Sequence, residues 1–350
     1  MSLMSQLACG PRRTYYHLQR CLSVSVVPFL RASPGIGKSA LAKKLGKEAN
    51  LKLIDLRLTS MAPEDMTGLV QLVNGNASYA PFREIFPLED SPLPLDNHGK
   101  PMNGWLLFLD EFASAPIEVK AASYRLILDH EVGQHKLHPN VYIVMASNLD
   151  SDNAITSPIG TAIESRVVHL EMKAVLEEWL EDVAYVEKYD ERIIGFLNYK
   201  PEYLMDFDPN HKNKTFCATR TWEFMNQLVN GQPISRDDRE LFCGTITPEV
   251  AGEFIAFSAN YGKVVTIEQV MAGPQFCAVP DTTDLLWATV TSLAAKITGP
   301  SLAPLCDYVE RLPNHFRLLF FRMALIRNPE LRATPEFAKS AIRISKYING

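Results

Sequence analysis

The sequence predicts an α/β domain built on a parallel sheet, followed by a helix-rich half. Short, wholly apolar runs at residues 105–109 and 141–146 are typical of strands buried on both faces of a sheet. Stretches with helical spacing, such as residues 38–49, separate these strand candidates. After about residue 172 the strand candidates stop, and helical spacing continues from Leu176 onward. We therefore expect a domain boundary near residues 170–175.

The remaining elements follow in chain order. A short helix is expected at residues 15–21 and a valine-rich strand at 24–30, although Pro28 disfavours a central ladder position and points to a start at Phe29. The second strand is expected at residues 51–58. Residues 67–104 are rich in proline and turn residues, which indicates an insertion of loops with a hairpin. Val119, Ala122 and Leu126 mark one face of a later helix.

Composition excludes several classes of protein. The chain has 350 residues, 47% of them hydrophobic and 21% charged, which is ordinary for a globular protein with a sizeable core. A net charge of -5 argues against nucleic-acid binding through overall charge, but leaves room for a local basic patch. Six scattered cysteines without a C-x-x-C pair indicate reduced thiols and a cytoplasmic location. No apolar run reaches the roughly 18 residues that span a bilayer, so no membrane association is expected.

The strongest motif is Ser-Pro-Gly-Ile-Gly-Lys-Ser at residues 33–39, between a strand and a helix. In this context it predicts a phosphate-binding loop, because glycines let backbone N–H groups approach phosphates and the helix N-terminus attracts anions. Lys38 is expected to reach the β- and γ-phosphates of ATP, and Ser39 to bind Mg²⁺. A glycine turn that only begins a helix is the alternative. The predicted nucleotide-binding residues are Ser33, Pro34, Gly35, Ile36, Gly37, Lys38, Ser39 and Ala40.

An acidic pair, Asp110 and Glu111, ends the buried strand at residues 106–109. Asp110 is expected to position Mg²⁺, and Glu111 to polarise the attacking water as general base. Asn148 ends the next strand, where an amide can contact the γ-phosphate or only turn the chain. An acidic strand end facing solvent is the alternative for the pair. The adjacent glutamate favours an ATPase over a P-loop kinase.

The order of these motifs resembles the MoxR-like branch of the AAA+ ATPases. The matching segments are Pro-Gly-Ile-Gly-Lys-Ser at 34–39, Leu-Asp-Glu-Phe at 109–112 and Ala-Ser-Asn at 146–148. Residues 63–68, 126–133 and 218–223 resemble weaker segments of the same branch, so the likeness spans about residues 22–230. The resemblance implies a P-loop AAA+ core over residues 1–172, a helical lid domain over 173–300 and a helical C-terminal extension over 301–350.

The resemblance also implies roles for single residues. Asn148 would be the first sensor, and Arg220 would contact the γ-phosphate of its own subunit from the lid. Arg166 lies where the family places an arginine finger that reaches the neighbour's nucleotide; a surface ion pair is the alternative for either arginine. The chain departs from the family pattern at Ala32, which replaces the usual first glycine, and at Val167, where an aromatic residue is common.

The implied function is ATP hydrolysis by a homo-oligomer, a hexameric ring, that remodels or activates a protein substrate or a von Willebrand factor A-domain partner. Two alternatives remain: a nucleic-acid-directed motor or loader, which the charge does not indicate, and a nucleotide-switched scaffold or kinase. Tyr79 and Phe82 in the insertion are candidate substrate contacts. His130, His135 and His138 lie close together in sequence, but nothing else there favours a metal site.

Overall fold

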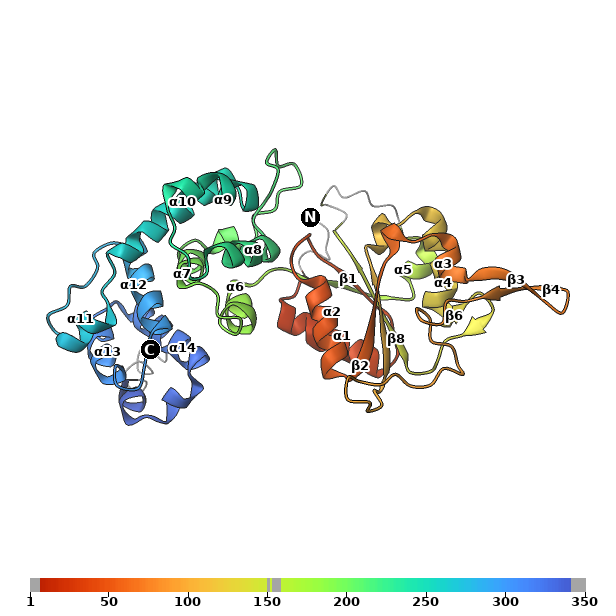
Figure 1. Cartoon of the computed structure of the whole chain (residues 1–350), viewed down its shortest axis with the longest axis horizontal. Helices are drawn as coiled ribbons and strands as arrows, with labels where there is room; N and C mark the ends of the chain where they lie inside the picture. Colours follow the sequence, from red (N-terminus) through yellow and green to blue (C-terminus); the bar gives the residue numbers. More distant parts are fainter. Residues whose placement is uncertain (1–6, 150–151, 153–158, 341–350) are drawn as a thin grey trace. The chain divides into compact units, whose positions relative to one another are not determined.

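The computed structural model describes residues 7–149, 152 and 159–340, and the chain divides into two compact units (Figure 1). The first, the sheet unit, comprises Met1–Ala174 with Asp208–His211. The second, the helical unit, comprises Val175–Phe207 with Lys212–Gly350. Each unit has its own core and is described separately.

The sheet unit contains a five-stranded parallel sheet with the strand order β2-β5-β8-β1-β9. Its strands are β1 (Pro28–Arg31), β2 (Leu51–Arg57), β5 (Gly104–Asp110), β8 (Val141–Ser147) and β9 (Val168–Glu171). The helices of this unit are α1 (Pro11–Ser23), α2 (Lys38–Glu48), α3 (Pro63–Thr67), α4 (Ile117–Asp129) and α5 (Thr161–Glu164). Because all five strands run in the same direction, their carboxyl ends meet at one edge of the sheet.

The wholly apolar sequence of β5 is explained by cores on both faces of the sheet. Leu107 and Leu109 pack into the core that includes Val119 of α4. Leu106 and Phe108 point to the opposite face and pack into the core beneath α1 and α2. Successive strand side chains alternate between faces, so a strand covered on both sides must be apolar throughout.

Two antiparallel hairpins leave the sheet unit next to each other. The larger one pairs β3 (Leu69–Val73) with β4 (Asn76–Ala80) and projects from the unit (Figure 1). The smaller one pairs β6 (Glu131–Val132) with β7 (His135–Lys136). They meet where His135 Nε2 lies 3.0 Å from the carbonyl oxygen of Tyr79. The hairpin predicted within residues 67–104 is therefore confirmed.

The sequence was less accurate at the first and last strands. The expected strand at 24–30 begins only at Pro28, because residues 24–27 leave helix α1 through a turn in which Ser25 has φ 53°. Strand β9 was not predicted. Its four residues lie at the sheet edge and are only partly buried or exposed, so they lack the apolar run by which a buried strand is recognised.

In the described residues of the helical unit the regular structure is helical. Its α-helices are α6 (Leu176–Trp179), α7 (Glu191–Tyr199), α8 (Thr219–Val229), α9 (Arg239–Thr245), α10 (Pro248–Ser258), α11 (Ile267–Ala272), α12 (Thr283–Ala295), α13 (Leu302–Val309) and α14 (Asn314–Arg327). Phe196 of α7 packs against Trp222 of α8 and Phe254 of α10, with ring centroids 5.9 and 5.4 Å from it. Such interlocked aromatic rings bury much apolar area and hold the helices together.

The parallel sheet and the helices that follow it confirm the predicted α/β class with a helical C-terminal part. The narrower assignment to the AAA+ kind stays a prediction. The further division of the helices at residue 300 stays a prediction. Among the described residues, no helix is both long and apolar enough to cross a bilayer.

Candidate nucleotide-binding site

The loop between β1 and α2 turns through two glycines in a left-handed conformation. Gly35 and Gly37 have φ values of 77° and 100°, in the left-handed region that side chains with a Cβ disfavour. Gly37 directly precedes α2, so the N–H groups of the first helical turn lie beside the loop. A glycine turn followed by a helix N-terminus is the kind of backbone that attracts anions.

Lys38 lies across this loop. Its ammonium donates to the carbonyl oxygens of Ala32 and Ser33 at 2.7 and 3.3 Å. It also donates to Asn148 Oδ1 at 2.9 Å. Lys38 follows β1 and Asn148 follows β8, and these two strands are neighbours in the sheet. The structure therefore brings together two predicted site residues that are 110 positions apart in sequence.

The acidic pair points in two directions. Asp110 is the last residue of β5, only 6% exposed, and accepts a hydrogen bond from Ser39 Oγ at 3.2 Å. Glu111 turns away toward β2, where its carboxylate accepts from Thr59 Oγ1 and lies 4.0 Å from the Arg57 guanidinium. The inner carboxylate thus faces the loop, and the outer one stands at the rim of the sheet, 39% exposed.

The donor set at Ser39 and Asp110 fits Mg²⁺. A hydroxyl and a carboxylate oxygen, 3.2 Å apart, are hard oxygen donors of the kind that this ion prefers. Burial, and then the nearby charge of Asp110, raises the pKa of Asp55 on β2. Ser39 and Asp110 would hold the ion, with further ligands from phosphate and water.

Several contacts at the site were not found from the sequence. Asp152 is buried and accepts from Ser33 Oγ at 3.5 Å, so it supports the start of the loop. Thr59 lies just beyond β2 and binds Glu111. Neither residue belongs to a recognisable motif, since each reaches the site only through the order of strands in the sheet.

The two predicted arginines come from other elements. Arg166 follows α5 at the surface of the sheet unit, and its Nη1 donates to the carbonyl oxygen of Ala162 at 3.0 Å. Arg220 is exposed in the first turn of α8, in the helical unit. Their roles remain predictions.

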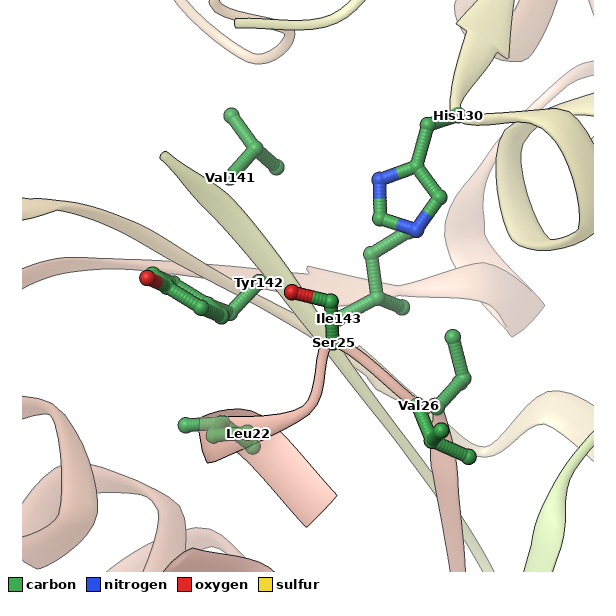
Figure 2. A pocket seen from close by; sticks show the side chains of 8 residues that line it. Leu22, Ser25, Val26, His130, Val141, Tyr142 and Ile143 are labelled. Atoms are coloured by element: carbon green, nitrogen blue, oxygen red, sulfur yellow. The ribbon is translucent and has the colours of Figure 1, made fainter. Parts of the chain in front are cut away.

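A small depression lies at the amino-terminal ends of β1 and β8, beside the end of α4, at the opposite edge of the sheet from Lys38. Figure 2 shows His130 and Tyr142 at its wall. Its lining residues are Leu22, Ser25, Val26, Val27, His130, Val141, Tyr142 and Ile143. The lining is mainly apolar, and desolvation lowers the pKa of His130. Among the described residues, no group of three or more His, Cys, Asp or Glu could hold a metal ion, here or elsewhere.

No protein-family model matches the chain, and no curated protein sequence matches it. Many solved structures resemble it, among them two whose likeness covers most of this chain. A putative ATPase from Cytophaga hutchinsonii is 13% identical, with 94% of this chain and 87% of that chain covered and a TM-score of 0.37. NtrX from Brucella abortus is 12% identical, with 100% and 69% covered and a TM-score of 0.33. Likeness at this level carries no information about activity.

Proposed function

We propose that the sheet unit binds ATP with Mg²⁺ and hydrolyses it with water. One observation carries this proposal: Lys38, Ser39, Asp110 and Asn148 lie within hydrogen-bonding distance of one another in pairs, at the carboxyl ends of neighbouring parallel strands. Ligands of open α/β sheets bind outside this edge. A lysine on a glycine loop, beside a hydroxyl and a carboxylate, is the set of groups that phosphoryl transfer uses.

Each residue then has a definite task. Lys38 exchanges its contacts with Ala32, Ser33 and Asn148 for the β- and γ-phosphates. Ser39 and Asp110 hold Mg²⁺, which would neutralise charge on the phosphates. Asn148 orients the γ-phosphate or the water, and Glu111 accepts the proton of that water.

The Glu111→Gln variant tests the general base. It keeps the side-chain size but loses the proton acceptor, so it should bind ATP with unchanged affinity while turnover falls by about 10²–10⁴-fold. Glu118→Gln is the matched control, because Glu118 is an exposed carboxylate in the first turn of α4. Turnover by Glu111→Gln at the wild-type rate would show that another group activates the water.

We further propose that the protein works as a MoxR-type AAA+ ring, with six subunits and an ATP site at each subunit interface. The exposure of Arg166 supports this, because an arginine that acts on a neighbour's nucleotide has to lie at the surface. Arg220 is assigned to the nucleotide of its own subunit. The six unpaired cysteines fit a reducing, cytoplasm-like compartment.

Mixed assemblies separate these two arginine roles. Arg166→Ala mixed with Glu111→Gln should regain part of the turnover, because the intact Glu111 of one subunit then meets the intact Arg166 of its neighbour. Arg220→Ala mixed with Glu111→Gln should stay inactive, since no single subunit is complete. Equal behaviour of the two mixtures, or a monomer that turns over ATP at full rate, would contradict the assignment.

The partner we propose is a protein, remodelled or activated by the ring, with a von Willebrand factor A-domain protein as one candidate. The β3–β4 hairpin supports a protein partner. Five of its apolar side chains are exposed, and residues 69–82 contain no charged residue. A nucleic-acid contact at this hairpin would require basic side chains for the phosphates. DNA- or RNA-stimulated turnover that survives the loss of hairpin side chains would favour the nucleic-acid alternative.

A further inference from the structure

The backbone of Glu111 adopts an unusual conformation. Its φ and ψ are 58° and 30°, in the left-handed region. In that region the Cβ of an L-residue lies too close to the following carbonyl oxygen. A non-glycine residue keeps such a conformation only where the surrounding structure holds it. The direction of the Glu111 side chain therefore depends on what fixes the turn that follows it.

That turn is a single 3₁₀ turn, Phe112–Ser114, closed by the Ser114 N–H donating to the Glu111 carbonyl oxygen at 3.0 Å. Two side chains from other elements hold its central residue, Ala113. The N–H of Ala113 donates to Ser147 Oγ of β8 at 3.3 Å. The carbonyl oxygen of Ala113 accepts from the Lys120 ammonium of α4 at 2.6 Å. Both peptide groups that flank Ala113 are thus fixed from outside the turn.

Lys120 is an unusual residue for the inner face of a helix. It is only 3% exposed, and burial lowers the pKa of its ammonium. A buried cationic group is unfavourable unless its hydrogen bonds compensate, and an apolar side chain would pack α4 onto the sheet without that cost. The short bond to Ala113 gives the ammonium a partner two residues from the proposed general base.

We propose that Lys120 is a positioning residue for Glu111: by holding Ala113 from α4, it fixes the left-handed turn that aims the Glu111 carboxylate. This inference rests on the proposed function, because it concerns the same carboxylate. Ser147 holds the same residue from β8 and acts with Lys120. Neither side chain touches the nucleotide in this role; each acts on hydrolysis through the backbone of Ala113.

The test compares Lys120→Met, which keeps the length of the side chain but removes the donor, with Ser123→Ala. Ser123 is a buried residue of the same helix whose hydroxyl donates within the helix, to the Val119 carbonyl oxygen at 2.7 Å. Turnover per bound ATP, equilibrium ATP affinity and amide exchange of the nucleotide-free protein are measured for each. In Lys120→Met, kcat should fall about tenfold or more while ATP affinity changes less than about twofold. Amide exchange should increase at residues 111–115. Ser123→Ala should show neither change.

Three results would overturn the inference. The first is a kcat of Lys120→Met within about twofold of wild type. The second is a fall in kcat matched by an equal fall in the fraction of protein that binds ATP, and the third is unchanged amide exchange at residues 111–115. A wild-type protein that does not hydrolyse ATP would instead refute the proposed function. If Lys120→Met does not fold, Ser147→Ala decides the question by the same measurements, because it releases the other peptide group of Ala113.

Discussion

Replacing either of two glycines near the start and end of α2 with alanine should change the stability of the sheet unit, but in opposite directions. Gly37 precedes α2 with φ 100°, and a Cβ there would meet nothing within 4 Å, so the change acts only on the backbone. The left-handed conformation costs an L-residue about 1–2 kcal/mol. Reduced freedom of the unfolded chain returns about 0.4–1 kcal/mol. Gly37→Ala should therefore destabilise the sheet unit by about 1 kcal/mol.

Gly46 lies inside α2, and its Cβ would make ordinary contacts, with the Leu51 carbonyl oxygen at 3.4 Å and Leu106 Cδ2 at 3.7 Å. Gly46→Ala should stabilise the unit by about 0.5–1 kcal/mol, because alanine loses less freedom in a helix. A change of 1 kcal/mol moves Tm by about 2–4 °C at this size. The two variants should therefore melt on opposite sides of wild type.

Thermal unfolding without nucleotide measures this difference, and ATP titration measures its effect on the site. Gly37→Ala should weaken ATP binding, because the loop no longer holds its N–H groups toward the phosphates. Gly46→Ala should bind ATP like wild type. If Gly37→Ala melts at or above the wild-type temperature, the loop conformation described here is wrong. A lower Tm for Gly46→Ala would show that the contacts with Leu51 and Leu106 are too close to accept a methyl group.

Three further outcomes are expected. Asn148→Ala should lower kcat by about tenfold or more while ATP affinity falls less than in Lys38→Ala, because the amide acts on the γ-phosphate or the water; an unchanged kcat contradicts this. Because burial lowers the pKa of His130 below its ordinary 6.5, the unfolded chain takes up the proton first as pH falls, and stability declines from about pH 6.5 downward. Asparagine tolerates the φ of 53° at this position, so the His130→Asn variant should fold normally. When the pH is lowered from about 7.5 to 5.5, the Tm of this variant should fall less than the Tm of wild type, and equal falls would show that His130 does not destabilise the fold at low pH. Leu72→Asp should change the free energy of unfolding by less than about 0.5 kcal/mol, since Leu72 is 78% exposed, and a larger loss would show that the hairpin side chain is packed.

The sequence alone determined the elements that carry their own local signal. The glycine loop before α2, the buried strands β5 and β8 and the acidic pair at the end of β5 were all recognised, because glycine conformations, wholly apolar runs and adjacent carboxylates follow directly from residue type. The change to a helical second half was also readable. The short edge strand β9 was missed, because a half-buried strand of four residues has no periodicity that distinguishes it from a loop.

The tertiary structure decided which of these residues meet. Asn148 follows β8 and Lys38 follows β1, and they meet because these two strands are neighbours in the sheet. The strand order likewise brings Asp110, at the end of β5, to Ser39. The same packing brings Lys120 and Ser147 to the peptide groups of Ala113. The spacing of these residues in the sequence does not predict either contact. The chemistry of each residue follows from its type alone. Residues far apart in the chain come together because both faces of the sheet are buried, and that burial depends on the whole domain.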